Sequence, residues 1–196
     1  MLALNVAILP PPDVAALAER LSASLVADRP RPLRLGPHHL PHITLTQQFV
    51  RTHDLERVFA VVDQVMKRCG PLHMRVSGSA RAGRSVWMSI ESRASLVTLH
   101  EDLMEALQPF EQVDGDVRAF ADADTLSRAV AWVARYRTDA AFASFRPHIT
   151  LGHAEVAPDI EPIEFVATTV AACHLGHFGS CRSVLRRWRL GGEGEN

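Results

Sequence analysis

The stretch Pro41-His42-Ile43-Thr44-Leu45 decides the fold, because it occurs again, unchanged, as Pro147-His148-Ile149-Thr150-Leu151. The two copies are 106 residues apart (148 − 42), about half the length of the chain. An identical segment at this spacing is typical of a duplicated unit with one copy in each lobe. Isoleucine and threonine favour strands, and proline is tolerated where a strand starts. The sequence therefore predicts two related lobes, each with one strand that carries the repeat.

Side chains alternate between the two faces of a strand, which separates the residues of each copy into two sets. Isoleucine and leucine face one side, which we expect to be the core, while histidine and threonine face the other. A pseudo-two-fold axis between the lobes would bring His42, Thr44, His148 and Thr150 together in one groove. One imidazole can then act as a base and the other as an acid, while each hydroxyl donates to a phosphate oxygen. This set predicts phosphodiester chemistry with no metal and no cofactor.

The rest of the chain alternates between helical and strand-like patterns. Apolar residues at helical spacing predict helices over 13–25, 52–66, 95–107 and, with a weaker pattern, 126–136. Strands are expected over 1–9, 40–45, 72–80, 85–90, 145–153, 163–175 and 183–190. The chain lacks regular βαβ spacing and a glycine-rich phosphate loop. This order favours an α+β fold of two antiparallel sheets with helices outside and a central groove, followed by a flexible tail at 191–196.

Composition is that of one globular domain spanning residues 1–196, since 47% of the residues are hydrophobic and 22% are charged. The 21 basic residues nearly balance the 22 acidic ones, so any nucleic-acid partner must be held by a local patch. The apolar opening at 1–9 ends at Pro10, too short for a membrane span. Three cysteines without CxxC spacing argue against a disulfide framework. We expect a cytoplasmic monomer that does not bind membranes.

The paired segments resemble the His-x-Thr-x motifs of the two-histidine phosphoesterase superfamily, which contains the 2′-5′ RNA ligases and the RNA cyclic phosphodiesterases. The resemblance implies a bilobal α+β fold and metal-independent attack on 2′,3′-cyclic phosphates or 2′-5′ linkages, at RNA ends or in nucleotides. It places the catalytic pair on His42 and His148 and the phosphate-binding pair on Thr44 and Thr150. After the first motif the chain reads Thr46-Gln47-Gln48-Phe49-Val50, unlike the x-Phe-Leu-Gly of better-known ligase-like members. It therefore resembles a divergent branch.

Other residues near the motifs have two interpretations each. Arg146 lies two residues before His148, where its guanidinium could bind a phosphate oxygen or remain solvated at the strand entry. Residues 185–190 could form a basic, aromatic platform for single-stranded RNA, or a final strand with Trp188 packed. Trp87 lies between apolar neighbours, and we predict that it belongs to the core rather than to a base-stacking platform. Both tryptophans are thus expected to be structural.

The remaining histidines could compete as metal ligands. A metal site could combine the motif histidines with His38, His39 and His153. However, no HExxH, His-x-His or carboxylate cluster accompanies these histidines. We therefore expect His38, His39 and His153 to lie in loops or at the rim of the groove. The segment 173–181, with the pattern C-H-x-x-H-x-x-x-C, has poor spacing for metal ligands. Two alternatives to hydrolysis stay open, namely RNA ligation through the same groove and binding of a nucleotide or RNA end without turnover.

Overall fold

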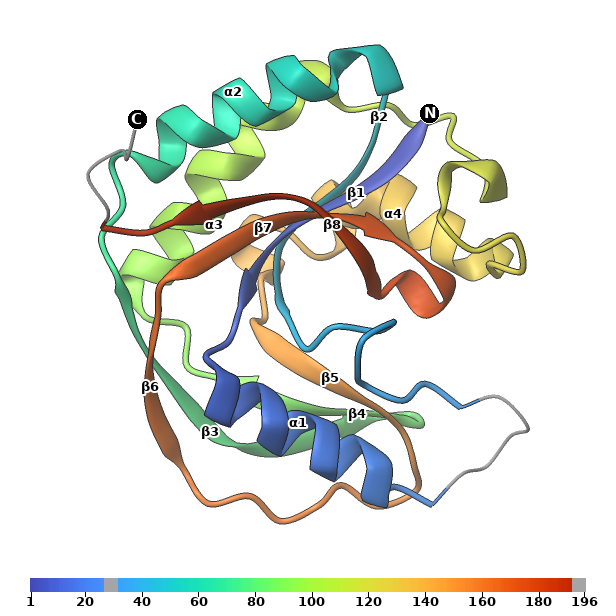
Figure 1. The fold of residues 1–196 in the computed structure, drawn as a ribbon. Helices are drawn as coiled ribbons and strands as arrows, with labels where there is room; N and C mark the ends of the chain where they lie inside the picture. Colours follow the sequence, from blue (N-terminus) through green and yellow to red (C-terminus); the bar gives the residue numbers. More distant parts are fainter. Residues whose placement is uncertain (27–31, 192–196) are drawn as a thin grey trace.

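Residues 1–26 and 32–191 are described by the computed structural model, which contains two four-stranded antiparallel sheets (Figure 1). The first sheet has the order β2-β1-β7-β8, with strands β1 (Leu2–Leu9), β2 (Ile43–Val50), β7 (Thr169–Leu175) and β8 (Cys181–Arg189). The second has the order β5-β4-β3-β6, with strands β3 (Leu72–Ala82), β4 (Ser85–Ile90), β5 (His148–His153) and β6 (Ile163–Ala167). The predicted α+β fold with two antiparallel sheets is confirmed.

Four helices cover the sheets, namely α1 (Pro12–Ser24), α2 (Leu55–Met66), α3 (Ala94–Leu107) and α4 (Ser127–Asp139). Helix α1 connects β1 to β2 of the first sheet but packs against β5 of the second. Helices α3 and α4 lie between β4 and β5 in sequence but pack against β2 of the first sheet. Each motif strand is therefore covered by a helix that connects two strands of the other sheet in the sequence.

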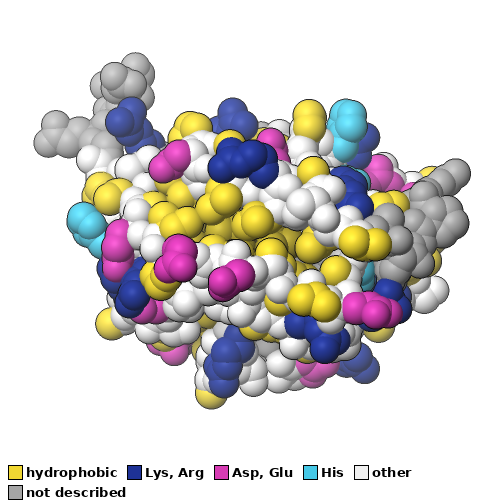
Figure 2. Space-filling view, turned by 90° about the horizontal axis from the view of Figure 1, so that it is seen from below, with side chains coloured by type: hydrophobic (Ala, Val, Ile, Leu, Met, Phe, Trp, Pro, Cys, Tyr) yellow, Lys and Arg dark blue, Asp and Glu magenta, His cyan; other side chains and the backbone are white. Residues whose placement is uncertain are grey.

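Helix α2 lies along the top of the molecule in Figure 1, and α1 lies along the bottom. The face turned downward in that view carries hydrophobic side chains at its centre and charged side chains around them (Figure 2). In the described part of the chain, none of the helices combines the length and the apolarity that a membrane span requires. Cys69, Cys173 and Cys181 are free thiols.

The two motif strands share a local irregularity as well as a sequence. Both are edge strands, β2 beside β1 and β5 beside β4. The register against the neighbouring strand skips one residue in each, Leu45 in β2 and Leu151 in β5. These are β-bulges at the same position of the repeat, and each shifts the alternation of side chains by one residue. The shared bulge supports the predicted two-fold relation between the sheets.

The alternation within each repeat follows the prediction. Ile43, Leu45, Ile149 and Leu151 are fully buried in one hydrophobic core, which also contains residues of α1, α2 and α3. The histidine and threonine of each copy are only partly buried, on the opposite face. Burying four branched aliphatic side chains contributes roughly 1.5–3 kcal/mol each, so the core fixes which face of each strand carries the polar residues.

Several predicted strands have different bounds in the structure. The strand expected over 145–153 begins only at His148, that over 72–80 extends to Ala82, and that over 183–190 runs from Cys181 to Arg189. The strand expected over 40–45 begins at Ile43 and continues to Val50, because the polar residues Thr46, Gln47 and Gln48 pair with β1 and are buried. The single strand expected over 163–175 is wrong. It is two strands, β6 and β7, which belong to different sheets and meet at Thr168. In Figure 1 the chain passes there from the lower sheet to the upper one. The tail predicted at 191–196 lies, beyond Gly191, outside the described residues.

Candidate active site

The two motif histidines are held in the same way. Nδ1 of His42 lies 2.7 Å from the carbonyl oxygen of Leu40, and Nδ1 of His148 lies 2.7 Å from that of Arg146. A carbonyl oxygen can only accept, so Nδ1 carries the proton in each ring. Nε2 is then the nitrogen that can exchange a proton with a ligand. In each copy the proline lies between the histidine and its carbonyl partner, and it fixes one backbone angle of that short turn.

Burial lowers the pKa of both motif imidazoles. It lowers the pKa of His42 from 6.5 to about 4, although the bond to the Leu40 carbonyl acts in the opposite direction. A positive charge on His148 would lower the pKa of His42 further. The strands that carry them, β2 and β5, are in contact. Burial also lowers the pKa of His148, against the effect of its bond to the Arg146 carbonyl.

The hydroxyl of Thr44 has a partner that sequence reasoning did not identify. Nδ2 of Asn5, which is fully buried in β1, donates to Thr44 Oγ1 over 3.2 Å and to Cys181 Sγ over 3.5 Å. Because Thr44 Oγ1 accepts this bond, its own hydrogen is directed away from Asn5 and can be donated to a ligand. A single asparagine in the otherwise apolar stretch 2–9 was the signal in the sequence.

Trp87 lies on the site face of the second sheet, so its predicted place in the core is wrong. It pairs with Thr150 across β4 and β5, and its ring centroid is 5.6 Å from that of His148. Its sequence neighbours Val86 and Met88 are fully buried, and alternation along the strand turns Trp87 to the other side. The apolar neighbours suggested a core position for Trp87. Because those neighbours occupy the core face of β4, the indole lies on the opposite face, beside the site.

A buried histidine outside the repeats ties the two motifs together. His100 of α3 is fully buried, and its Nδ1 lies 2.6 Å from the carbonyl oxygen of Leu45, the bulge residue of the first motif. Its Nε2 accepts the backbone N–H of Phe142 over 2.9 Å, and its ring stacks on Phe145 at 3.9 Å. Phe145 lies three residues before His148. His100 therefore fixes the backbone around both motifs, and burial lowers its pKa.

Arg146 and the C-terminal basic run do not join these residues. Arg146 is exposed, and its Nη1 donates to the carbonyl oxygens of Ala143 and Phe145 over 3.0 and 2.9 Å. The guanidinium is thus bound to the backbone before β5. Trp188 is buried and packs edge-on against Phe59 with 6.1 Å between ring centroids. That ring cannot serve as a stacking platform while it is packed in this way.

The other histidines lie in loops and at strand ends. His38 and His39 line a cavity of about 310 Å³ together with His177, and His153 ends β5. His174 Nε2 lies 2.9 Å from the carbonyl oxygen of Ala119. Across residues 1–26 and 32–191, no group of three or more histidine, cysteine or acidic side chains is arranged to hold a metal ion.

A comparison with protein families matches residues 10–175 to the 2′-5′ RNA ligase superfamily. The match includes both motifs and most of the chain. This chain belongs to the 2′-5′ RNA ligase superfamily. A search of the curated proteins finds no match.

Several solved structures share the fold. TT0787 of Thermus thermophilus is 20% identical with a TM-score of 0.65, and the match covers 98% of this chain and 100% of that one. E. coli LigT complexed with phosphate is 18% identical with a TM-score of 0.61, covering 97% and 98% of the two chains. E. coli LigT complexed with 3′-AMP is 15% identical with a TM-score of 0.58, covering 97% and 99%. The fold thus extends over nearly the whole of each chain.

Proposed function

We propose that this member of the 2′-5′ RNA ligase superfamily is a phosphoesterase that hydrolyses 2′,3′-cyclic phosphates of RNA ends or nucleotides without a metal ion. The observation that carries the proposal is the pair of imidazoles on the contacting strands β2 and β5, held identically through Nδ1, with Nε2 left for proton transfer. The phosphate and 3′-AMP complexes of E. coli LigT support a phosphate-containing ligand.

In this mechanism the phosphorus lies between His42 and His148. Nε2 of one ring takes a proton from water as the water oxygen bonds to phosphorus. The bond from phosphorus to one ribose oxygen breaks, and the other ring gives that oxygen its proton. Thr44 and Thr150 donate hydrogen bonds to the non-bridging oxygens, whose negative charge grows in the transition state. Proton exchange with solvent then returns both rings to their starting states.

We assign the base to His42 and the acid to His148. The pKa of His42 is lowered to about 4, so this ring is neutral over most of the pH range. His148 lies beside the indole of Trp87, with 5.6 Å between the ring centroids. The face of an indole stabilises a nearby cation by roughly 0.5–2 kcal/mol, which favours an imidazolium at His148. A bound phosphate anion raises the pKa of both rings and supplies the rest of the stabilisation.

The test is hydrolysis of a panel of nucleoside 2′,3′-cyclic phosphates with EDTA present, by the wild type and by the His42→Ala/His148→Ala double variant. We expect turnover by the wild type and none by the variant, with circular dichroism as the control for folding. The optimum of kcat/KM should lie between about pH 4 and 6.5, because both histidine pKa values are lowered from 6.5 in the free protein. Full activity in the double variant would overturn the mechanism.

Ligation is the second candidate, because the family match is to RNA ligases and the same groups can run the reaction in reverse. A 5′-hydroxyl would then replace water as the nucleophile. A gel assay for 2′-5′ joined product separates the two activities. Nucleotide binding that the threonine substitutions weaken, with no product over long incubation, would instead indicate a binding module.

A further inference from the structure

On each motif strand, the face that carries the histidine and the threonine also carries a third residue further along the strand. Because of the bulges at Leu45 and Leu151, Gln47 and His153 face the same side as the histidine and threonine before them. Both third residues contact η5 (His177–Gly179), the short turn between β7 and β8. Nε2 of Gln47 donates to the carbonyl oxygen of Gly179 over 3.5 Å, and the ring of His153 lies 5.9 Å from that of Phe178. The η5 turn thus closes one end of the motif site.

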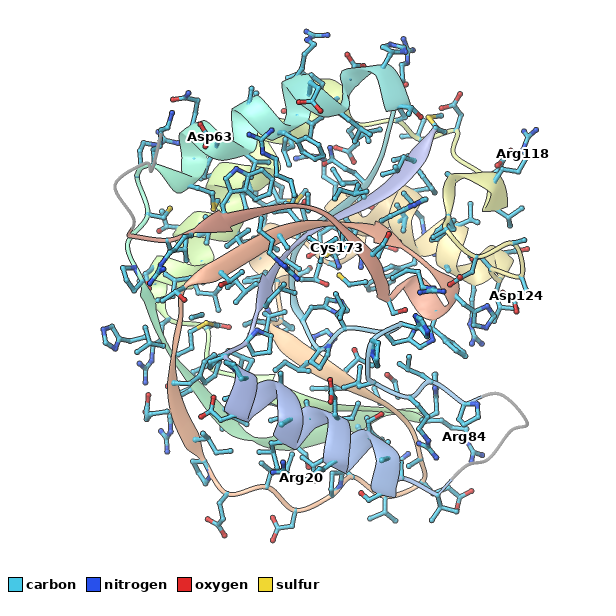
Figure 3. All side chains as sticks on the ribbon, in the orientation of Figure 1. Arg20, Asp63, Arg84, Arg118, Asp124 and Cys173 are labelled. Carbon is cyan, nitrogen blue, oxygen red and sulfur yellow. The ribbon has the colours of Figure 1, made fainter. Side chains whose placement is uncertain are left out.

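A cavity of about 310 Å³ opens beside this turn. Its lining combines an aromatic ring with hydrogen-bond donors and acceptors, including Phe178, His38, His39, Arg182, Asp122 and Asp124. Asp124 lies at the edge of the molecule beside the η5 turn (Figure 3), with Oδ1 3.3 Å from His177 Nδ1. Pockets for small molecules begin at about this size, and they typically combine an apolar surface with a few polar groups.

The turn that presents Phe178 is held firmly. Oδ2 of Asp122 accepts the backbone N–H of His177 over 2.7 Å, and Oδ1 accepts Nε–H of Arg182 over 3.1 Å. Phe178 itself has φ of 66°, in the left-handed region that non-glycine residues seldom adopt. Its ring lies 6.1 Å from that of His39. The fold therefore keeps an unfavourable backbone angle at the residue whose aromatic ring lines the cavity.

The lining suits a nucleobase better than a second phosphate. A base can stack on Phe178, donate from an amino group to Asp124, and accept from the imidazoles. A phosphate would meet two carboxylates, and Arg182, the guanidinium among the described lining residues, is already bound to Asp122 and to His38. The cavity also adjoins the strand that carries the second motif, because the ring of His153, three residues after Thr150 in β5, lies 5.9 Å from the ring of Phe178 in the lining.

We propose that this cavity binds the nucleobase of the substrate whose phosphate lies between His42 and His148. The inference rests on the proposed function, and it places the base of that substrate against the η5 turn. Phe178 is then a binding residue that sets specificity, and Asp122 is a positioning residue that holds the η5 turn.

The test compares adenosine 2′,3′-cyclic phosphate with glycerol 1,2-cyclic phosphate, which has no base. Phe178→Asn removes the ring and tolerates the left-handed backbone, and Phe178→Tyr keeps the ring. Leu185→Asn, at an exposed position of β8 outside the cavity lining, is the matched control. We expect Phe178→Asn to raise KM for the adenosine substrate about 10-fold, since base stacking contributes on this scale. Phe178→Tyr and Leu185→Asn should stay within about 2-fold of the wild type on both substrates.

Equal effects of Phe178→Asn on the two substrates, or no effect on the adenosine substrate, would overturn the proposal. If the wild type turns over neither substrate, the proposed hydrolysis has failed, and calorimetry with adenosine and with inorganic phosphate still tests the cavity. Adenosine binding that Phe178→Asn abolishes, with phosphate binding retained, supports the base site. Adenosine binding that this variant leaves unchanged contradicts it.

Discussion

The two copies of the repeat have the same sequence and the same backbone, but they differ in their surroundings. Both strands carry a bulge at the leucine, and both histidines are bound through Nδ1 to the carbonyl two residues earlier. Around the first copy, Asn5 binds the hydroxyl of Thr44. Around the second, Trp87 lies beside His148. The comparison teaches that neighbouring strands can give two identical pentapeptides different chemical roles, here a proposed base and a proposed acid.

Single alanine substitutions of the two histidines are the strongest test of whether the two copies have different roles. We expect His42→Ala and His148→Ala each to lower kcat/KM for a nucleoside cyclic phosphate by at least about 100-fold. A phosphodiester with a nitrophenyl leaving group needs no proton at the departing oxygen. It should therefore restore activity to His148→Ala but not to His42→Ala, as measured by release of nitrophenolate. Rescue of His42→Ala instead would exchange the two roles.

Stability against acid tests the burial of the first motif histidine. The pKa of His42 is about 4 in the folded protein and 6.5 when unperturbed. Between these pH values the unfolded chain binds a proton that the folded protein does not, so the free energy of unfolding falls as pH decreases. The loss due to His42 is on the order of 3 kcal/mol, complete near pH 4. Urea unfolding from pH 7 to 4 should show a flatter pH dependence for His42→Gln than for the wild type.

This prediction has a simple contrary result. If His42→Gln unfolds with the same pH dependence as the wild type, the pKa of His42 is not lowered in the folded protein.

Removing the partner of one threonine tests the first lobe alone. Asn5→Ala should lower kcat about 10-fold, because the Thr44 hydroxyl loses the bond that directs its hydrogen toward the phosphate. Thr44→Val should lower kcat by at least as much, and the double variant should add little to Thr44→Val. Steady-state kinetics on the three variants checks this. Additive effects would show that Asn5 does not act through Thr44.

Arg146 gives the smallest expected effect. Its side chain is exposed and bound to backbone carbonyls before β5, so Arg146→Ala should change kcat and KM by less than about 3-fold. An increase in KM above about 10-fold would show that the guanidinium turns toward the phosphate when substrate binds, as the sequence alone allowed.

The repeat made the fold class and the site face predictable, because period-two alternation of histidine and threonine against isoleucine and leucine leaves only one face for the core. Alternation within a strand does not show which residue of the neighbouring strand lies opposite a given side chain. Trp87 was misplaced for this reason, since its position beside His148 depends on the register between β4 and β5. The division of residues 163–175 into two strands was missed because the change of sheet at Thr168 leaves the apolar pattern almost unbroken.

Asn5 and His100 show a second limit of what the sequence can predict. Each is one polar residue in an apolar pattern, Asn5 within β1 and His100 among the leucines of α3. Such an interruption indicates that a buried partner exists, since buried polar groups are hydrogen-bonded, but it does not identify the partner. The partners, Thr44 and the backbone of Leu45 and Phe142, come from strands and turns far away in the sequence.

The exchange of helices between the sheets has a consequence for how such a chain is assembled. Because α1 covers β5 while α3 and α4 cover β2, neither half of the chain encloses its own motif strand. A fragment that ended after β4 would leave β2 without α3 and α4. The arrangement is that of a domain-swapped dimer joined into one polypeptide. A protein built from one such half would thus reach this fold only by pairing with a second copy, and covalent fusion makes that pairing permanent.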